Sequence, residues 1–167
     1  KSLFVKEKHV WLGYSIQTGK IAPNPAYIEA IGTLRPPKNM KALRSVLGVM
    51  DQLRRFIKNY AGRTLKLSAH VKDEKFSGLS PEALAEFEEM KKDIVKYIQE
   101  DRGLYYPKWD ETLRIRCDAS RDAIGMECWQ EYDSGPGKPT YHPIRFFSRK
   151  TKAAEQNYCD QLGIPVN

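Results

Sequence analysis

Asp118 is the residue whose type and position most directly indicate chemistry. It ends a run in which Leu113, Ile115 and Cys117 alternate with arginines, which is the period of a half-buried strand. An acid at the end of a strand, where a sheet meets solvent, is a place where folds put metal ligands. The same Asp-Ala-Ser sequence is also typical of an Asx turn. Taken alone, Asp118 therefore indicates either a metal ligand or a turn residue.

The elements around Asp118 are predicted to be three strands and a final helix. The strands cover about residues 112–118, 123–131 and 141–148, with a turn over 133–137 and a helix that begins near Lys152. Ser80-Pro81 opens an earlier helix with an apolar stripe that is typical of a core face. Before this helix, residues 61–79 are predicted to be irregular and polar.

The first third of the chain predicts a hairpin and two helices. Residues 1–22 form the predicted hairpin, because apolar residues alternate from Val10 to Ile16 and Gly19 follows in a turn. Asn24 then caps a short helix through Ile31 that has proline at its first position. Asn39 caps a longer helix that is predicted to run to about Asn59.

Positive charge is concentrated around this longer helix. The chain of 167 residues has a net charge of +7, whereas residues 35–66 alone carry nine basic side chains against one acid, Asp51. One face of the predicted helix is apolar, and the opposite face is basic with a glycine inside it: Lys41, Arg44, Gly48, Arg55 and Lys58. A basic stripe is commonly just a solvated surface. Gly48 favours a binding face, because a missing side chain costs helix stability but permits close approach.

Composition bears on the cellular compartment of the protein and on the kinds of site that it can form. Three cysteines without CxxC spacing indicate reduced thiols, so we expect an intracellular protein of the nucleus or cytoplasm. There is no apolar run of membrane-spanning length, and His9, His70 and His142 lack metal-ligand spacing with the cysteines. The first residue is Lys, so we expect a processed or excised segment.

Several motifs in one order give the chain a family resemblance. CDASRDAIGMECWQ, YHPIRFFSRK and TKAAEQNY resemble the start of the ribonuclease H domain of Ty3/gypsy-type retroelement reverse transcriptases. Upstream, WLGYSIQTGKIAPNP resembles the hairpin that grips the primer end, and LRPPKNMKALRSVLGVMDQLRRFIKNYA resembles the first thumb helices. The resemblance implies that Trp11, Gly13 and Tyr14 contact nucleic acid, and that the basic helix lies along the template–primer duplex.

The same resemblance implies an incomplete set of catalytic acids. Asp118 matches the first ribonuclease H acid, but the second falls at about Ile164, and the third and fourth lie beyond residue 167. Asp160 or Glu155 are the available substitutes, and a lone carboxylate holds Mg²⁺ poorly. No Asp-Asp pair is present for polymerisation. We therefore expect Asp118 to be a lone, inactive remnant, with no metal bound unless the ribonuclease H site is completed with Mg²⁺.

These observations predict an α+β fold, with a small helical thumb-like unit followed by a truncated ribonuclease H-like mixed sheet. The expected units are a primer-grip-like hairpin and short helix (1–32), a thumb-like unit (33–100) and the sheet unit (104–167). The predicted function is a catalytically silent module that binds a nucleic acid duplex or a protein partner. The strand at 113–118 is expected to offer an open edge for a partner or a second copy. The alternative is a fragment of an active retroelement reverse transcriptase, and residual metal-dependent nuclease activity is a weaker third interpretation.

Overall fold

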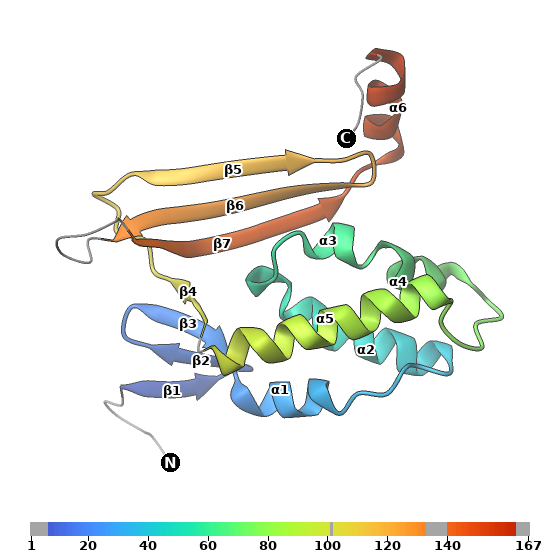
Figure 1. Cartoon of the computed structure of the whole chain (residues 1–167), viewed down its shortest axis with the longest axis horizontal. Coiled ribbons are helices and arrows are strands. Elements are labelled where there is room, and N and C mark those ends of the chain that lie inside the picture. Colours follow the sequence, from blue (N-terminus) through green and yellow to red (C-terminus); the bar gives the residue numbers. More distant parts are fainter. Residues whose placement is uncertain (1–6, 101, 133–139, 163–167) are drawn as a thin grey trace.

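The computed structural model describes residues 7–100, 102–132 and 140–162 of the chain. Helices α1–α5 (residues 25–99) form a layer below one antiparallel sheet, and a second, smaller sheet lies beside this helical layer (Figure 1). The predicted α+β class is confirmed. The predicted turn at 133–137 lies outside the described residues.

The smaller sheet has the order β1-β2-β3-β4, with strands Lys8–Trp11, Tyr14–Gln17, Lys20–Pro23 and Leu104–Tyr105. The turn before Lys20 lies where the sequence predicts it, with Gly19 at φ +75°. The single strand expected from Val10 to Ile16 is wrong. Leu12 and Gly13 both take positive φ, so the chain reverses there and β1 pairs with β2.

Two helices follow as their caps predict. In α1 (Pro25–Gly32) the Asn24 side chain accepts a hydrogen bond from Ala26 N, and in α2 (Met40–Gln52) Asn39 accepts one from Ala42 N. The expected extension of α2 to Asn59 is wrong. After α2 come a 3₁₀ turn, η1 (Arg54–Phe56), an extended Ile57 and a left-handed Asn59, so the helix cannot continue.

The segment predicted to be irregular is largely helical. It contains α3 (Tyr60–Arg63), α4 (Leu65–Ala69) and the 3₁₀ turn η2 (His70–Lys72). These elements are too short for helical periodicity to show in the sequence. The long helix α5 (Pro81–Gln99) begins at Pro81 as predicted and packs on α1 and α4.

The helices enclose a hydrophobic core to which both sheets contribute. Leu104 of β4 and Phe146 of β7 belong to it. Its most deeply buried side chains are Ile31, Leu43, Met50, Leu67, Phe87 and Met90. None of the helices among the described residues has the length and apolar character needed to cross a membrane.

The larger sheet has the order β5-β6-β7, with strands Leu113–Ala119, Ala123–Tyr132 and Thr140–Lys150. All three strands lie where the sequence predicts them, and every pairing in the described part is antiparallel. α6 (Ala153–Leu162) leaves the end of β7 and rises above the sheet (Figure 1).

Polar contacts fix the sheet to the helical layer. The Ser148 hydroxyl of β7 accepts a hydrogen bond from Ala61 N at 2.9 Å, and its carbonyl accepts one from Arg54 Nη2 at 2.9 Å. Beside them, Lys58 Nζ lies 2.7 Å from Oε1 of the buried Glu127 on β6. The region between α2 and α4 is therefore held against one end of β6 and β7.

Candidate nucleic-acid interface

The exposed face of α2 presents Lys41, Arg44 and Gly48 at helical spacing. Leu43, Val46 and Met50 on the opposite side are buried in the core, so the orientation of the helix is fixed. The exposed face that packing leaves to solvent is thus basic, as the sequence predicts.

Gly48 has no structural explanation within the described chain. A Cβ added at this position meets no atom within 4 Å. A glycine in a helix interior costs about 1 kcal/mol relative to alanine. Packing therefore permits alanine, and helix propensity favours it.

Two residues predicted for the same face lie elsewhere, because α2 ends at Gln52. The Arg55 guanidinium lies over the rings of Tyr14 and Phe56, 5.7 Å from each centroid. Lys58 forms the ion pair with Glu127. The prediction of one continuous five-residue stripe is wrong, and the part on α2 is Lys41, Arg44 and Gly48.

The β1–β2 turn brings the three predicted hairpin residues to one place. Trp11 is 59% exposed, whereas Tyr14 packs against Phe56 and donates a hydrogen bond to the carbonyl of Gln52 at 3.3 Å. Gly13 has φ +82°, and a Cβ there would lie 3.0 Å from the Tyr27 ring. Tyr14 and Gly13 therefore shape and anchor the turn, and Trp11 is exposed beside it.

Asp118 lies on the exposed strand β5, opposite Gly125 of β6. Glu155, a candidate substitute acid, is held by Arg149 through two contacts of 2.7 Å. These hydrogen bonds from Arg149, with a further one from the Lys152 backbone, lower the pKa of Glu155 from 4.5 to about 2. The side chain of Asp160 lies outside the described part of the structure. In that part, no three His, Cys, Asp or Glu side chains gather as a metal site.

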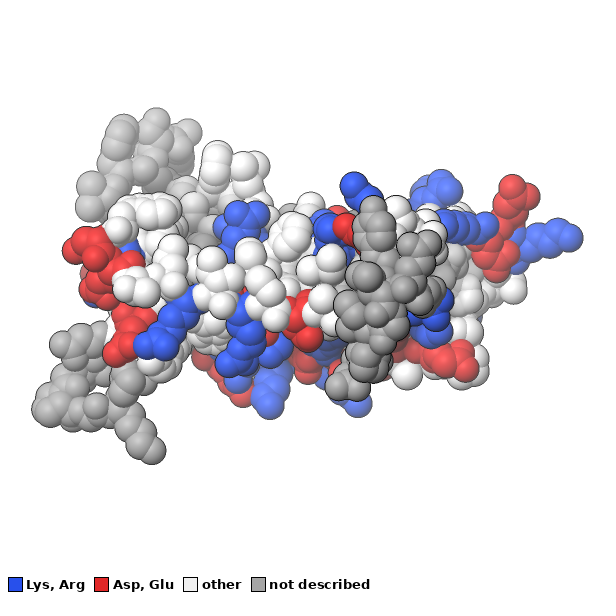
Figure 2. All heavy atoms as spheres, turned by 90° about the horizontal axis from the view of Figure 1, so that it is seen from above, with Lys and Arg blue, Asp and Glu red and all other residues white. Residues whose placement is uncertain are grey.

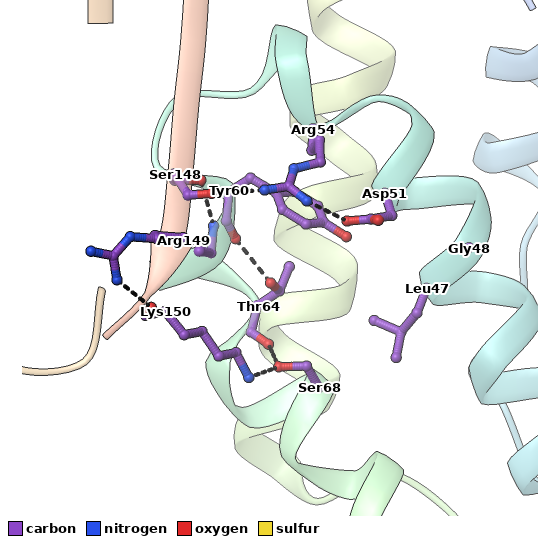
Figure 3. Close-up of a pocket in the computed structure, with 11 residues that line it drawn as sticks. Leu47, Gly48, Asp51, Arg54, Tyr60, Thr64, Ser68, Ser148, Arg149 and Lys150 are labelled. Atoms are coloured by element: carbon purple, nitrogen blue, oxygen red, sulfur yellow. Dashed lines mark hydrogen bonds and ion pairs between the residues drawn. The ribbon is translucent and has the colours of Figure 1, made fainter. Parts of the chain in front are cut away.

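A cleft that was not recognised from the sequence lies between α2 and β7 (Figure 3). Its volume is about 440 Å³. Leu47 and Gly48 line one wall, Lys150 lines the other, and Tyr60 and Ser68 lie between them. Burial, together with the charge of Asp51, raises the pKa of Tyr60, so its hydroxyl is neutral near pH 7. The basic end of the predicted third strand was the available sequence signal, but only the fold brings it to α2.

Comparison with known proteins agrees with the motifs. The family described as "RNase H-like domain found in reverse transcriptase" matches residues 80–161. The chain is 29% identical over 169 residues to the retrovirus-related Pol polyprotein from transposon opus of Drosophila melanogaster. It is 26% identical over 158 residues to the Tf2-3 transposon polyprotein of Schizosaccharomyces pombe. This chain is homologous to the reverse transcriptase region of Ty3/gypsy-type retroelement polyproteins.

The region shared with these retroelement proteins is a small part of them. Each alignment covers 95% of this chain, but only 16% of the opus polyprotein and 11% of the Tf2-3 polyprotein. The fold is similar to that of part of a foamy viral protease-reverse transcriptase solved in complex with RNA/DNA hybrid. That match has a TM-score of 0.68 and 17% identity, and covers 90% of this chain and 19% of that one.

Proposed function

We propose that this chain binds a nucleic acid duplex through the exposed face of α2 and the β1–β2 turn, without cutting it. The observation that carries the proposal is Gly48, which is bare, exposed and unexplained by packing, and lies one helical turn beyond Arg44 on the face that also carries Lys41. A ligand that approaches the helix backbone closely, and is attracted by positive charge, accounts for both features.

The solved relatives of this fold support a duplex as that ligand. The foamy viral protease-reverse transcriptase is described in complexes with RNA/DNA hybrid and with double-stranded DNA. Contacts between basic side chains and phosphates give sequence-independent binding, which weakens steeply as salt rises. The α2 face has the charge for such contacts, and exposed Trp11 has a ring that can stack at a duplex end.

The test is binding of a short RNA–DNA hybrid to the whole chain across a salt series, with Mg²⁺ present and strand cleavage followed in the same samples. We expect salt-dependent binding and intact strands. Arg44→Ala should weaken binding and reduce the salt slope by about 1, whereas Lys92→Ala on α5, which removes the same charge, should change neither. Absence of binding at low salt would overturn the proposal, and cleavage would overturn its non-catalytic part.

The alternative is that this chain acts within an active reverse transcriptase as one part of a longer polyprotein. The small share of each relative that it covers supports this alternative. A Tyr-x-Asp-Asp motif in the upstream sequence, together with Mg²⁺-dependent polymerisation by the longer protein, is its test. Asp118 would then complete a ribonuclease H site with acids supplied from outside the described residues.

A second candidate function is pairing through the free edge of β5. All seven residues of β5 are exposed, and β6 is its only partner among the described strands. Figure 2, which looks down on the molecule from above this sheet, shows uncharged surface with basic and acidic side chains among it. A strand with unpaired backbone groups can pair with a partner or a second copy.

Sedimentation of the chain at tens of micromolar tests this second function. We expect dimers or larger species in the wild-type protein, reduced by Ile115→Lys, because a charge on an edge strand opposes pairing. A strictly monomeric wild-type species would leave no support for self-association.

A further inference from the structure

Lys150 is a cation held at the wall of the α2–β7 cleft. Its ammonium donates a hydrogen bond to Ser68 Oγ at 2.5 Å, and an ammonium has three donors. Within the described residues no carboxylate lies within ion-pair distance of it. Burial and repulsion from Lys72 lower the pKa of Lys150, although the charge of Glu86 acts in the opposite direction. An anion bound beside this ammonium would compensate its charge and accept one of its remaining donors.

The two arginines beside Lys150 in the cleft already have partners within the protein. The Arg149 side chain points away from the cleft (Figure 3), and its guanidinium is paired with Glu155 at 2.7 Å. Arg54 donates to the Ser148 carbonyl at 2.9 Å and lies 3.7 Å from Asp51 Oδ1, so it spans from α2 to β7. Arg54 thus holds the two walls together, and Lys150 is the cation that remains for a ligand.

The opposite wall has contrasting chemistry. Gly48 leaves its backbone bare toward the cleft, and Leu47 adds an apolar surface next to it. The space accepts a group that is neutral on one side and anionic on the other. A sugar–phosphate unit has this character, with a sugar against Gly48 and a phosphate at Lys150.

We propose that the α2–β7 cleft seats one strand of the bound duplex, with Lys150 contacting a phosphodiester and Arg54 positioning the walls. This inference rests on the duplex binding proposed above. It extends that surface from Lys41 and Arg44 across Gly48 to β7, so that the helical layer and the larger sheet contact the same strand.

The experiment compares Lys150→Ala, Lys150→Arg and the control Lys92→Ala in hybrid binding across a salt series. We expect Lys150→Ala to weaken binding on the order of tenfold and to reduce the salt slope by about 1. Lys150→Arg should restore most of the affinity, because it keeps a charged donor at the site. Urea denaturation of each variant shows whether a loss of affinity has a separate origin in stability.

Three results would overturn the inference. The first is an unchanged salt slope in Lys150→Ala while Arg44→Ala weakens binding, which leaves the proposed function standing. The second is absence of duplex binding by the wild-type chain, which removes both. The third is binding of inorganic phosphate that is lost in Lys150→Ala but does not displace the duplex at constant ionic strength, because the cleft would then hold a free anion and not the strand.

Discussion

Lys58 and Lys150 are both lysines near the contact between helices and sheet, yet their surroundings differ. Lys58 is paired at 2.7 Å with Glu127, whose side chain is only 8% exposed. Lys150 contacts a serine hydroxyl instead. A count of basic residues in the sequence treats these two lysines as equivalent. Because the Glu127 carboxylate on β6 is buried, its ion pair with Lys58 has a structural role.

Replacing Lys58 by alanine should therefore destabilise the protein. It would leave the Glu127 carboxylate buried, and among the described residues the Trp129 indole would be its one remaining side-chain hydrogen-bond donor. We expect the free energy of unfolding, measured with urea, to fall by about 1–2 kcal/mol, because a buried acceptor loses its partner. The loss is no larger because Lys58 itself is largely exposed. Lys41→Ala, at an exposed site on α2, is the control. Equal unfolding midpoints for the two variants would contradict this assignment.

Gly48→Ala should separate stability from binding. A Cβ has open space at this position, so the substitution should stabilise the chain by about 1 kcal/mol through helix propensity. It should at the same time weaken duplex binding, because the methyl group occupies the side from which the strand approaches. Urea midpoints and hybrid affinity measured on the same preparation test both halves. A stabilised variant that binds as tightly as wild type would show that no ligand uses this position.

At the scale of secondary structure, the elements with strong local signals were predictable. Asn24 and Asn39 cap helices because their side chains accept backbone hydrogen bonds within three residues, a purely local arrangement. The strands of the larger sheet follow from alternation and turn residues. The Leu12-Gly13 turn and the end of α2 depend on backbone conformations that packing against Tyr27 and the sheet imposes, so sequence periodicity did not reveal them.

The start of α6 should be sensitive to acid. Glu155 accepts hydrogen bonds from Arg149 and from Lys152 N, and its pKa is lowered to about 2. Because the folded-state pKa lies below the unfolded value of 4.5, this contribution is fully present above about pH 4.5 and is lost as pH falls toward 2. NMR titration of the Glu155 carboxyl carbon measures it directly. Arg149→Ala should move the midpoint up toward 4.5, and an unchanged midpoint would contradict the pairing.

At the scale of the whole molecule, the larger sheet is joined to the helical layer by polar groups at one end, in addition to the apolar contact of Phe146 with the core. Ser148 is central to this contact, since its hydroxyl and its carbonyl bond to two different helical segments. Its side chain is 3% exposed, so water cannot readily replace a lost partner. Such a contact requires both layers to be folded at once. The cleft proposed to seat a strand exists only while they are docked.

The chain should consequently unfold as one cooperative unit, and Ser148→Ala should shift that transition without splitting it. The variant leaves Ala61 N–H buried without its acceptor, which should cost about 1–3 kcal/mol. Of the three tryptophans, Trp129 is half-buried against Phe146, whereas Trp11 and Trp109 are already largely exposed, so the change in fluorescence on unfolding reports mainly on the sheet. Circular dichroism reports on the helices. Both signals should move to the same lower urea midpoint, with Ser45→Ala on exposed α2 surface as the control. Separate midpoints for the two signals in the wild-type chain would mean that the sheet and the helical layer fold independently, and that the strand-seating cleft is an occasional contact between two domains.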